Sequence, residues 1–483
     1  MGDNVDIGNS DQEEGPDYSL LPSVAWVKIL SNLSLGDRYN ASQTCHALFD
    51  TFNHPSLWHT MRFDILGNAS CWTFNWWTGR EDEEQENSVP EKYISMVTKF
   101  GRFFQNLTIS VSGFLHSDFG RWNDILSEIA KQCRLEKLTL AVGNLTTRTH
   151  LDGKGPEKKN VIALVDLVRN AFRMKSFQLL SWPIYPSTMD DPDANIFQAL
   201  KENPKLKDLE ELSLFWCEQS YWSERTPLLL SPEKTLGIIE HFKSLTSLSL
   251  RSPMLDESIF QELCSVNRNA KLQLLRIFLN YNKHLENFAV PEISSRTWEQ
   301  LLKCNPGVCV ELTVMSRVPT EELANILKPG CPLTKLKLSK YARCDEYLIS
   351  WLCDKYYSTL RLFECFADVE GADHVLVRLV SEAKHLQNFV FLSTLNYTTA
   401  IEIAKVRGKH WKSLVFGYFS YEDKVNEIYG EDEVVSRNEN GEYVLVAIEK
   451  FHRRELNPDE EETRRLYLCE EMSKILGYTW TNF

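Results

Sequence analysis

Residues 245–250 read Leu-Thr-Ser-Leu-Ser-Leu, with an apolar side chain at the first, fourth and sixth positions. The fourth and sixth side chains of such a segment point the same way from a short strand, because alternate strand residues share a face. Eleven segments of the chain have this spacing: Phe104/Leu107/Ile109, Leu135/Leu138/Leu140, Met174/Phe177/Leu179, Leu209/Leu212/Leu214, Leu245/Leu248/Leu250, Leu272/Leu275/Ile277, Cys309/Leu312/Val314, Leu333/Leu336/Leu338, Leu360/Phe363/Cys365, Leu386/Phe389/Phe391 and Trp411/Leu414/Phe416.

The spacing between these segments is that of a leucine-rich repeat. The last five begin 24, 27, 26 and 25 residues apart, although one earlier step reaches 39. Unrelated amphipathic elements would not keep this period. One unit cannot bury its apolar face alone, so the units must stack, with return helices expected at 324–327, 345–351 and 398–406. We therefore predict an α/β fold, a leucine-rich-repeat solenoid (horseshoe) over residues 93–421.

Length and charge agree with an extended repeat protein. The chain has 483 residues, about three times a typical domain, and a net charge of −14. This acidity argues against a nucleic-acid partner bound through phosphate neutralisation. We find neither a secretory signal nor a run of about 18 apolar residues, so we expect no membrane contact and a cytoplasmic or nuclear location. The 12 cysteines lack any C-x-x-C, which favours reduced, mostly buried thiols.

A small three-helix module is predicted ahead of the repeats. Its first helix begins at the proline of Leu21-Pro22, Asp37 is the expected cap of the second, and Leu57-Trp58 closes the segment. Two apolar stripes give the helices a weak shared core, formed by Val24, Val27, Leu30 and Leu33, then Ala41, Cys45 and Leu48. Such a unit is marginally stable alone and gains stability by docking. The alternative interpretation is a simple cap for the solenoid.

This module resembles an F-box. The similarity rests on LPSVAWVKILSNL at 21–33, DRYNASQTCH at 37–46 and PSLW at 55–58, with Val24, His46 and Leu48 departing from the family pattern. Residues 298–302, 326–333 and 403–409 also resemble repeats of an F-box protein. The resemblance implies an F-box at 18–63 that binds the adaptor Skp1, and through it a cullin ligase, while the repeats hold a protein substrate. The implied Skp1-binding residues are Leu21, Pro22, Val27, Leu30, Leu33, Leu57 and Trp58.

No motif for chemistry accompanies this module. The chain contains no G-x-x-x-x-G-K-[ST], no H-E-x-x-H and no G-x-S-x-G, so we expect no cofactor, no metal and no catalytic residue. Cys304 and Cys309 form the closest cysteine pair, and we expect both to pack within the repeats. An enzyme with an unrecognised site is the third and weakest interpretation.

The residues between the repeat core positions are candidates for binding a substrate. Aromatic and arginine side chains are typical of binding hot spots, and Glu311 and Glu364 oppose the cations among them. An ordinary solvated sheet face is the alternative. The predicted substrate contacts are Phe215, Arg251, Arg276, Phe278, Lys335, Lys337 and Phe366, together with Trp480 and Phe483 of a C-terminal tail.

The remaining segments read as connections and ends. We predict a disordered acidic N-terminus at 1–17, a Trp-rich and acidic linker at 64–92, and surface loops at 143–160 and 182–193. Residues 422–483 combine an acidic segment, a helix that caps the last repeat through Leu468, Met472 and Ile475, and the tail. The leading hypothesis is a non-catalytic substrate receptor of a ubiquitin ligase, and the alternative is an intracellular scaffold without a ligase.

Overall fold

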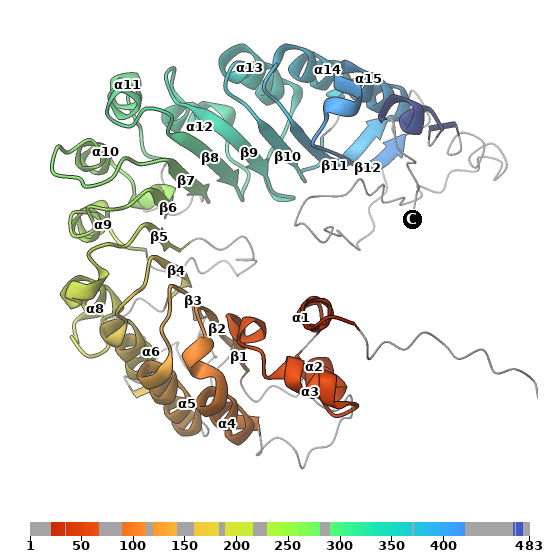
Figure 1. Ribbon diagram of the computed structural model, residues 1–483. Coiled ribbons are helices and arrows are strands. Elements are labelled where there is room, and N and C mark those ends of the chain that lie inside the picture. Colours follow the sequence, from red (N-terminus) through yellow and green to blue (C-terminus); the bar gives the residue numbers. More distant parts are fainter. Residues whose placement is uncertain are drawn as a thin grey trace, which may run out of the picture.

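The computed structural model describes residues 21–33, 35–66, 89–112, 119–142, 159–182, 189–215, 229–280, 290–369, 371–420, 467–468 and 470–476. Within them, one parallel sheet runs from β1 to β12 in strict chain order. Figure 1 shows the strands lining the inner side of an open arc, with the return helices on its outer side. The predicted horseshoe is confirmed.

Each repeat contributes one short strand to this sheet. The strands are β1 (Thr60–Leu66), β2 (Asn106–Ser112), β3 (Lys137–Val142), β4 (Ser176–Ser181), β5 (Glu211–Leu214), β6 (Ser247–Arg251), β7 (Leu274–Leu279), β8 (Cys309–Val314), β9 (Leu333–Leu338), β10 (Leu362–Cys365), β11 (Asn388–Asn396) and β12 (Ser413–Ser420).

Helices precede the sheet and then alternate with its strands. The N-terminal module comprises α1 (Ser23–Ser31), α2 (Leu35–Ser42), α3 (His46–Phe52) and the 3-10 turn η2 (Pro55–Trp58). The return helices are α4 (Val89–Phe100), α5 (Phe119–Gln132), α6 (Lys159–Asn170), α8 (Ile196–Glu202), α9 (Pro232–Ile239), α10 (Glu257–Leu263), α11 (Ser295–Cys304), α12 (Thr320–Ile326), α13 (Glu346–Tyr356), α14 (Asp373–Glu382) and α15 (Tyr397–Arg407).

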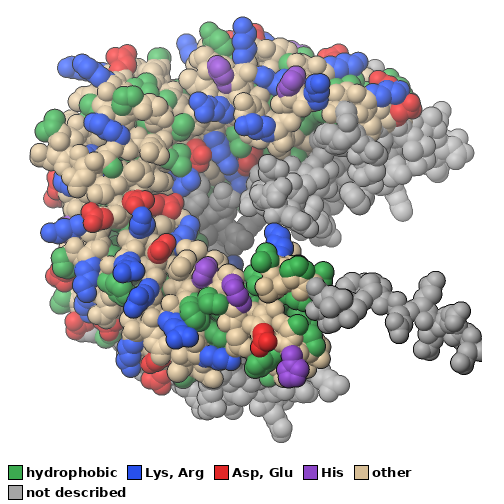
Figure 2. All heavy atoms as spheres, in the orientation of Figure 1, with side chains coloured by type: hydrophobic (Ala, Val, Ile, Leu, Met, Phe, Trp, Pro, Cys, Tyr) green, Lys and Arg blue, Asp and Glu red, His purple; other side chains and the backbone are tan. Residues whose placement is uncertain are grey.

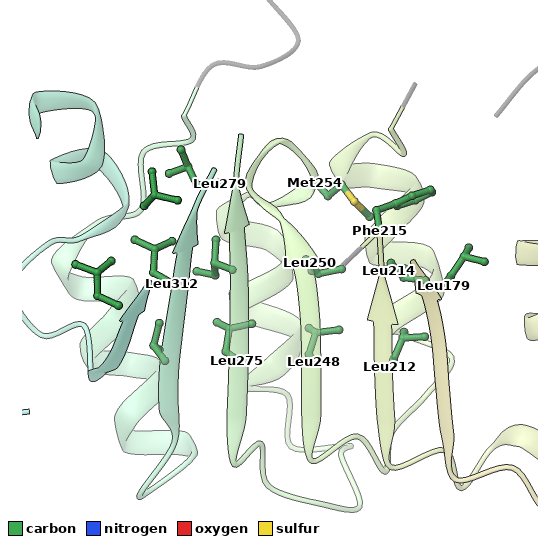
Figure 3. Packing of buried hydrophobic residues seen from close by; sticks show 14 of the residues in the cluster. Leu179, Leu212, Leu214, Phe215, Leu248, Leu250, Met254, Leu275, Leu279 and Leu312 are labelled. Carbon is green, nitrogen blue, oxygen red and sulfur yellow. The ribbon is translucent and has the colours of Figure 1, made fainter. Parts of the chain in front are cut away.

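Columns of leucine hold the repeats together. Leu212 of β5 is in register with Leu248 of β6, which is in register with Leu275 of β7, and all three side chains are buried. Figure 3 shows these side chains aligned across neighbouring strands. Each strand buries this column against its neighbouring repeats, so stability comes from stacking.

Two buried asparagines fasten neighbouring repeats. Asn203 Nδ2 donates to the carbonyl oxygens of Val168 (2.9 Å) and Ala171 (2.7 Å), at the end of the preceding return helix α6. Asn305 Nδ2 donates to the Leu263 carbonyl (3.2 Å), and its Oδ1 accepts from the Leu272 backbone amide (2.8 Å). The carbonyl groups of Val168, Ala171 and Leu263 lie at helix ends that would otherwise leave them without partners, and the Leu272 amide lies just before β7.

Three sequence expectations differ from the structure. The sheet begins at Thr60, ahead of the predicted start at residue 93, because β1 follows η2 directly and pairs with β2. Helix α2 begins at Leu35, so Asp37 lies in its first turn and is not its cap. Cys309 is only half-buried, because Val310 and the alternate residues that follow it point into the core.

Candidate protein-interaction surfaces

The N-terminal module is built around a buried tryptophan. Trp58 of η2 is 1% exposed, and its Nε1 donates to the carbonyl oxygen of Phe52 (2.9 Å). Arg38 of α2 links two further parts of the module, since its guanidinium donates to the carbonyl oxygens of Leu33 (2.9 Å) and Leu57 (3.1 Å). The end of α1 and the turn η2 are therefore held to α2.

The same tryptophan joins the module to the solenoid. The Trp58 ring stacks on Phe100 at the end of α4, and Phe52 packs edge-on against both rings. Together with the pairing of β1 and β2, this contact makes the module continuous with the first repeat. The module therefore covers the N-terminal end of the apolar core.

Apolar side chains also gather on the outside of this module. Figure 2 shows hydrophobic side chains over α1 to α3. Five of the large exposed hydrophobic residues in the described part of the chain lie here, with Val24 the most exposed at 77%. We call them the module apolar set: Leu21, Val24, Ile29, Tyr39 and Phe49. Exposed apolar groups concentrated on so small a unit indicate a protein-binding surface.

The residues implied by the F-box resemblance divide between interior and surface. Leu21 and Pro22 are exposed and Val27 and Leu33 are half-buried, so these four can reach a partner. The expectation of direct contact is wrong for the other three, because they pack in the core of the module: Leu30, Leu57 and Trp58.

Sequence reasoning missed part of the exposed set. Val24 was placed in the buried stripe of α1, but it faces solvent with Leu21, three residues earlier. A three-residue spacing fits an outward stripe as well as an inward one, so periodicity could not separate the two. Nothing in the sequence singled out Phe49 of α3.

The concave face of the sheet carries a ladder of opposite charges. Arg276, Glu311 and Lys335 occupy register positions on β7, β8 and β9. Arg276 Nε lies 3.0 Å from Glu311 Oε2, and its Nη1 lies 3.4 Å from Glu211 Oε1 on β5. The predicted opposition of charges is thus realised as ion pairs between strands, and all these side chains remain partly exposed.

The carboxyl group of Glu211 has a lowered pKa because of its neighbours on β3, β4 and β7. Burial acts to raise the pKa of its carboxyl group, but hydrogen bonds from Ser176 and Gln178 and the positive charges of Lys137 and Arg276 outweigh that effect. The net result is a lowered pKa, so the carboxylate form is favoured.

A second charge cluster lies on β9 and β10. The carboxylate of Glu364 is fully buried, 3.3 Å from Lys335 Nζ and 3.7 Å from Lys337 Nζ. Lys337 Nζ also lies 5.1 Å from the centre of the half-buried Phe366 ring. Four of the predicted substrate residues are therefore accessible: Arg276 on β7, Lys335 and Lys337 on β9, and Phe366 directly after β10.

Three other predicted substrate residues are buried, and the expectation that they face a partner is wrong. Phe215 adopts a φ of 60°, which turns the chain at the end of β5, and its ring lies 6.2 Å from that of Phe197 on α8. Arg251 Nε donates to the Phe215 carbonyl (2.9 Å), and its guanidinium lies 5.2 Å from the centre of the buried Phe278 ring.

The predicted tail contacts, Trp480 and Phe483, lie outside the described residues, as do most of the two predicted loops and the linker. The helical segment formed by 467–468 and 470–476 buries Leu468 and Met472 and partly buries Ile475. Among described residues, no three His, Cys, Asp or Glu side chains are grouped to hold a metal, and no helix is long and apolar enough to cross a membrane.

Comparison with known proteins agrees with a small helical module followed by a repeat solenoid. A family model described as F-box-like matches residues 18–64. F-box/LRR-repeat protein 21 of Mus musculus is 23% identical over 377 residues, covering 78% of this chain and 76% of that protein. The Ovis aries protein of the same name is 22% identical over 397 residues, covering 81% of each chain.

These similarities, with the fold, support an F-box protein with leucine-rich repeats. They do not support F-box only protein 33, the particular relative that the runs at 298–302, 326–333 and 403–409 suggested. At the level of the family they support a role in substrate recognition without catalysis.

Proposed function

We propose that this chain is the substrate-recognition subunit of a Skp1–cullin–F-box ubiquitin ligase, located in the cytoplasm or nucleus. Its N-terminal module would bind Skp1, and its repeats would hold a protein target for ubiquitination and proteasomal degradation. The proposal rests mainly on one observation: the module exposes five large apolar side chains, while Trp58 packs against the first repeat.

Capping and Skp1 binding use different side chains of the module. Trp58 and Phe52 face Phe100 and cover the end of the solenoid. Leu21, Val24 and Phe49 are exposed and contribute little to that cover. A scaffold needs only the inward residues, whereas a ligase subunit also uses the outward ones, so the two functions can be separated by surface substitutions.

The chain would contribute positioning and no bond-breaking chemistry. A target held by the repeats would be kept near the ubiquitin carrier, and a high effective concentration raises the rate of transfer. Because the Trp58–Phe100 contact and the β1–β2 pairing connect module and solenoid, the target would be presented in a defined orientation.

We place the target on the ladder and the adjoining charge cluster, from β7 to β10. Arg276, Glu311, Lys335 and Lys337 offer both signs of charge in partly exposed positions, and Phe366 adds an aromatic surface. Such a surface favours a target with paired charges over a uniformly charged one.

A proximity-labelling and pull-down experiment tests both parts of the proposal. The tagged chain should recover Skp1, a cullin and at least one target that accumulates when the proteasome is inhibited. The double variant Lys335→Glu/Lys337→Glu should lose the target and keep Skp1. Recovery of the same targets by that variant would show that the ladder does not bind them. Absence of Skp1 from the proteins recovered with the unmodified chain would leave only the scaffold function.

A further inference from the structure

Two neighbouring return helices end with adjacent thiols. Helix α10 is followed directly by Cys264, and α11 ends at Cys304. Figure 1 shows the two helices next to each other on the outer side of the arc. The two thiols lie close enough to interact, because the Cys304 thiol contributes to raising the pKa of Cys264. The bond from Asn305 Nδ2 to the Leu263 carbonyl (3.2 Å) holds the residues beside them together.

Exposure distinguishes this pair from a second one. Cys264 and Cys304 are free thiols and only half-buried, so a small reagent can reach them. Cys344 and Cys365 form a second interacting pair, but both thiols are buried in the core. The described residues therefore include an accessible pair and an inaccessible pair of neighbouring thiols, and the inaccessible pair is the control.

We propose that Cys264 and Cys304 form a reversible disulfide between repeats when the folded chain meets a small-molecule disulfide such as oxidised glutathione. The thiolate of Cys304 attacks one glutathione sulfur and releases the first glutathione thiolate. Cys264 then loses its proton and attacks the Cys304 sulfur of the mixed disulfide, which releases the second glutathione thiolate. The two cysteines lose two electrons and two protons, and one oxidised glutathione becomes two reduced molecules.

The surroundings of Cys264 disfavour its thiolate form. Burial and the interaction with Cys304 raise the pKa of Cys264 to about 12, against the weaker opposing effect of Lys271 and Arg268. Cys264 thus keeps its proton at neutral pH, so the proposal gives it the second step. Arg268 is itself engaged, since its Nη1 lies 3.9 Å from Glu262 Oε1.

The cross-link would lock one joint of the solenoid. It would connect α10 to α11 behind β7 and β8, the strands that carry Arg276 and Glu311. Repeats contact only their neighbours, so a bond between adjacent units restricts the motion of the arc at that place. This modification stands independently of a ligase role.

The full-length chain is incubated in glutathione buffers of increasing oxidised fraction, quenched with acid and alkylated. Peptide mass spectrometry then tests the proposal. Trypsin should yield residues 252–268 joined to 304–317, whereas Cys344 and Cys365 should stay alkylated. Because Cys309 shares the second peptide, the Cys309→Ser variant must keep the cross-link. The Cys264→Ser variant must lose it and retain glutathione on Cys304. The oxidised chain should melt roughly 5 °C higher than the reduced chain.

Two results would overturn the proposal. One is glutathione accumulating on Cys304 of the unmodified sequence without closure to Cys264, which would show that the two sulfurs do not meet. The other is a Cys344–Cys365 bond forming at lower oxidant than the Cys264–Cys304 bond, which would show that oxidation follows unfolding and not the folded geometry.

Discussion

The indole ring of Trp58 lies parallel to the ring of Phe100, with centroids 3.9 Å apart and planes 6° apart. Trp58 ends the N-terminal module and Phe100 ends the first return helix, so this contact is the joint between the two parts of the molecule. It explains how a small module with a weak core of its own is held in a fixed position on the solenoid.

Trp58→Ala should destabilise the chain by about 3–5 kcal/mol, because it removes a large buried ring and leaves a cavity at the joint. Denaturant unfolding measures the loss. Hydrogen exchange should show increased opening of α1 to α3 and β1, while β9 to β11 should be unaffected. Equal loss of protection at both ends of the sheet would contradict the assignment of Trp58 to the joint.

Trp58→Phe is the matched control. It keeps an aromatic ring opposite Phe100 but removes the Nε1 donor to the Phe52 carbonyl. We expect a smaller loss of about 1–2 kcal/mol, since the stacked surface is partly retained. A loss as large as that of Trp58→Ala would mean that the hydrogen bond, and not the stacking, makes the joint.

Glu364→Gln should destabilise the chain by about 1–3 kcal/mol. The substitution keeps the shape of the side chain but leaves Lys335 and Lys337 as neighbouring positive charges without their shared carboxylate. Glu311→Gln is the control, because its ion pair with Arg276 is partly exposed and should contribute less than about 1 kcal/mol. Chemical denaturation of both variants should give this order, and the reverse order would contradict it.

Glu211 should make the folded chain sensitive to acid. Its pKa is lowered in the folded state from an ordinary value of 4.5, so the unfolded chain binds its proton first as the pH falls. The stabilisation is complete above pH 4.5 and is lost as the pH falls through the lower folded pKa. Glu211→Gln should therefore have a flatter stability profile below pH 4.5. Glu210→Gln, at the exposed neighbouring residue, should keep the original profile, and an unchanged profile for Glu211→Gln would contradict the prediction.

The repeat architecture could be predicted from sequence because stacking demands an apolar column in every unit. Leu248 and Leu250 point inward, as do their neighbours across the sheet, because every unit must bury its apolar side chains against the next unit. The first strand was missed because β1 follows Trp58 inside a segment whose pattern indicated helices. One irregular unit, at Cys309, differed because Val308 and Val310 on either side point into the core, so Cys309 lies outside the alternating buried set.

The candidate surfaces were harder to predict because exposure depends on three-dimensional neighbours. The ion pairs of Arg276 and Lys335 follow from strand register, which the repeat spacing supplies. Phe215 is buried because the chain turns there with a left-handed backbone conformation. Glycine usually occupies such a position, so a phenylalanine does not predict the turn. Trp58 is buried and Val24 is exposed because the module docks on α4 through Trp58, and the sequence does not show this docking.

Calorimetric titration of the purified chain with Skp1 tests the central claim most directly. The variants are Val24→Asp and the control Val266→Asp, which changes a still more exposed valine of the solenoid. The account predicts one Skp1 per chain, an affinity at least about tenfold lower for Val24→Asp, and no change for Val266→Asp. All three proteins should unfold at the same denaturant concentration. The claim would be contradicted by no binding to the unmodified sequence, or by equal affinity of Val24→Asp.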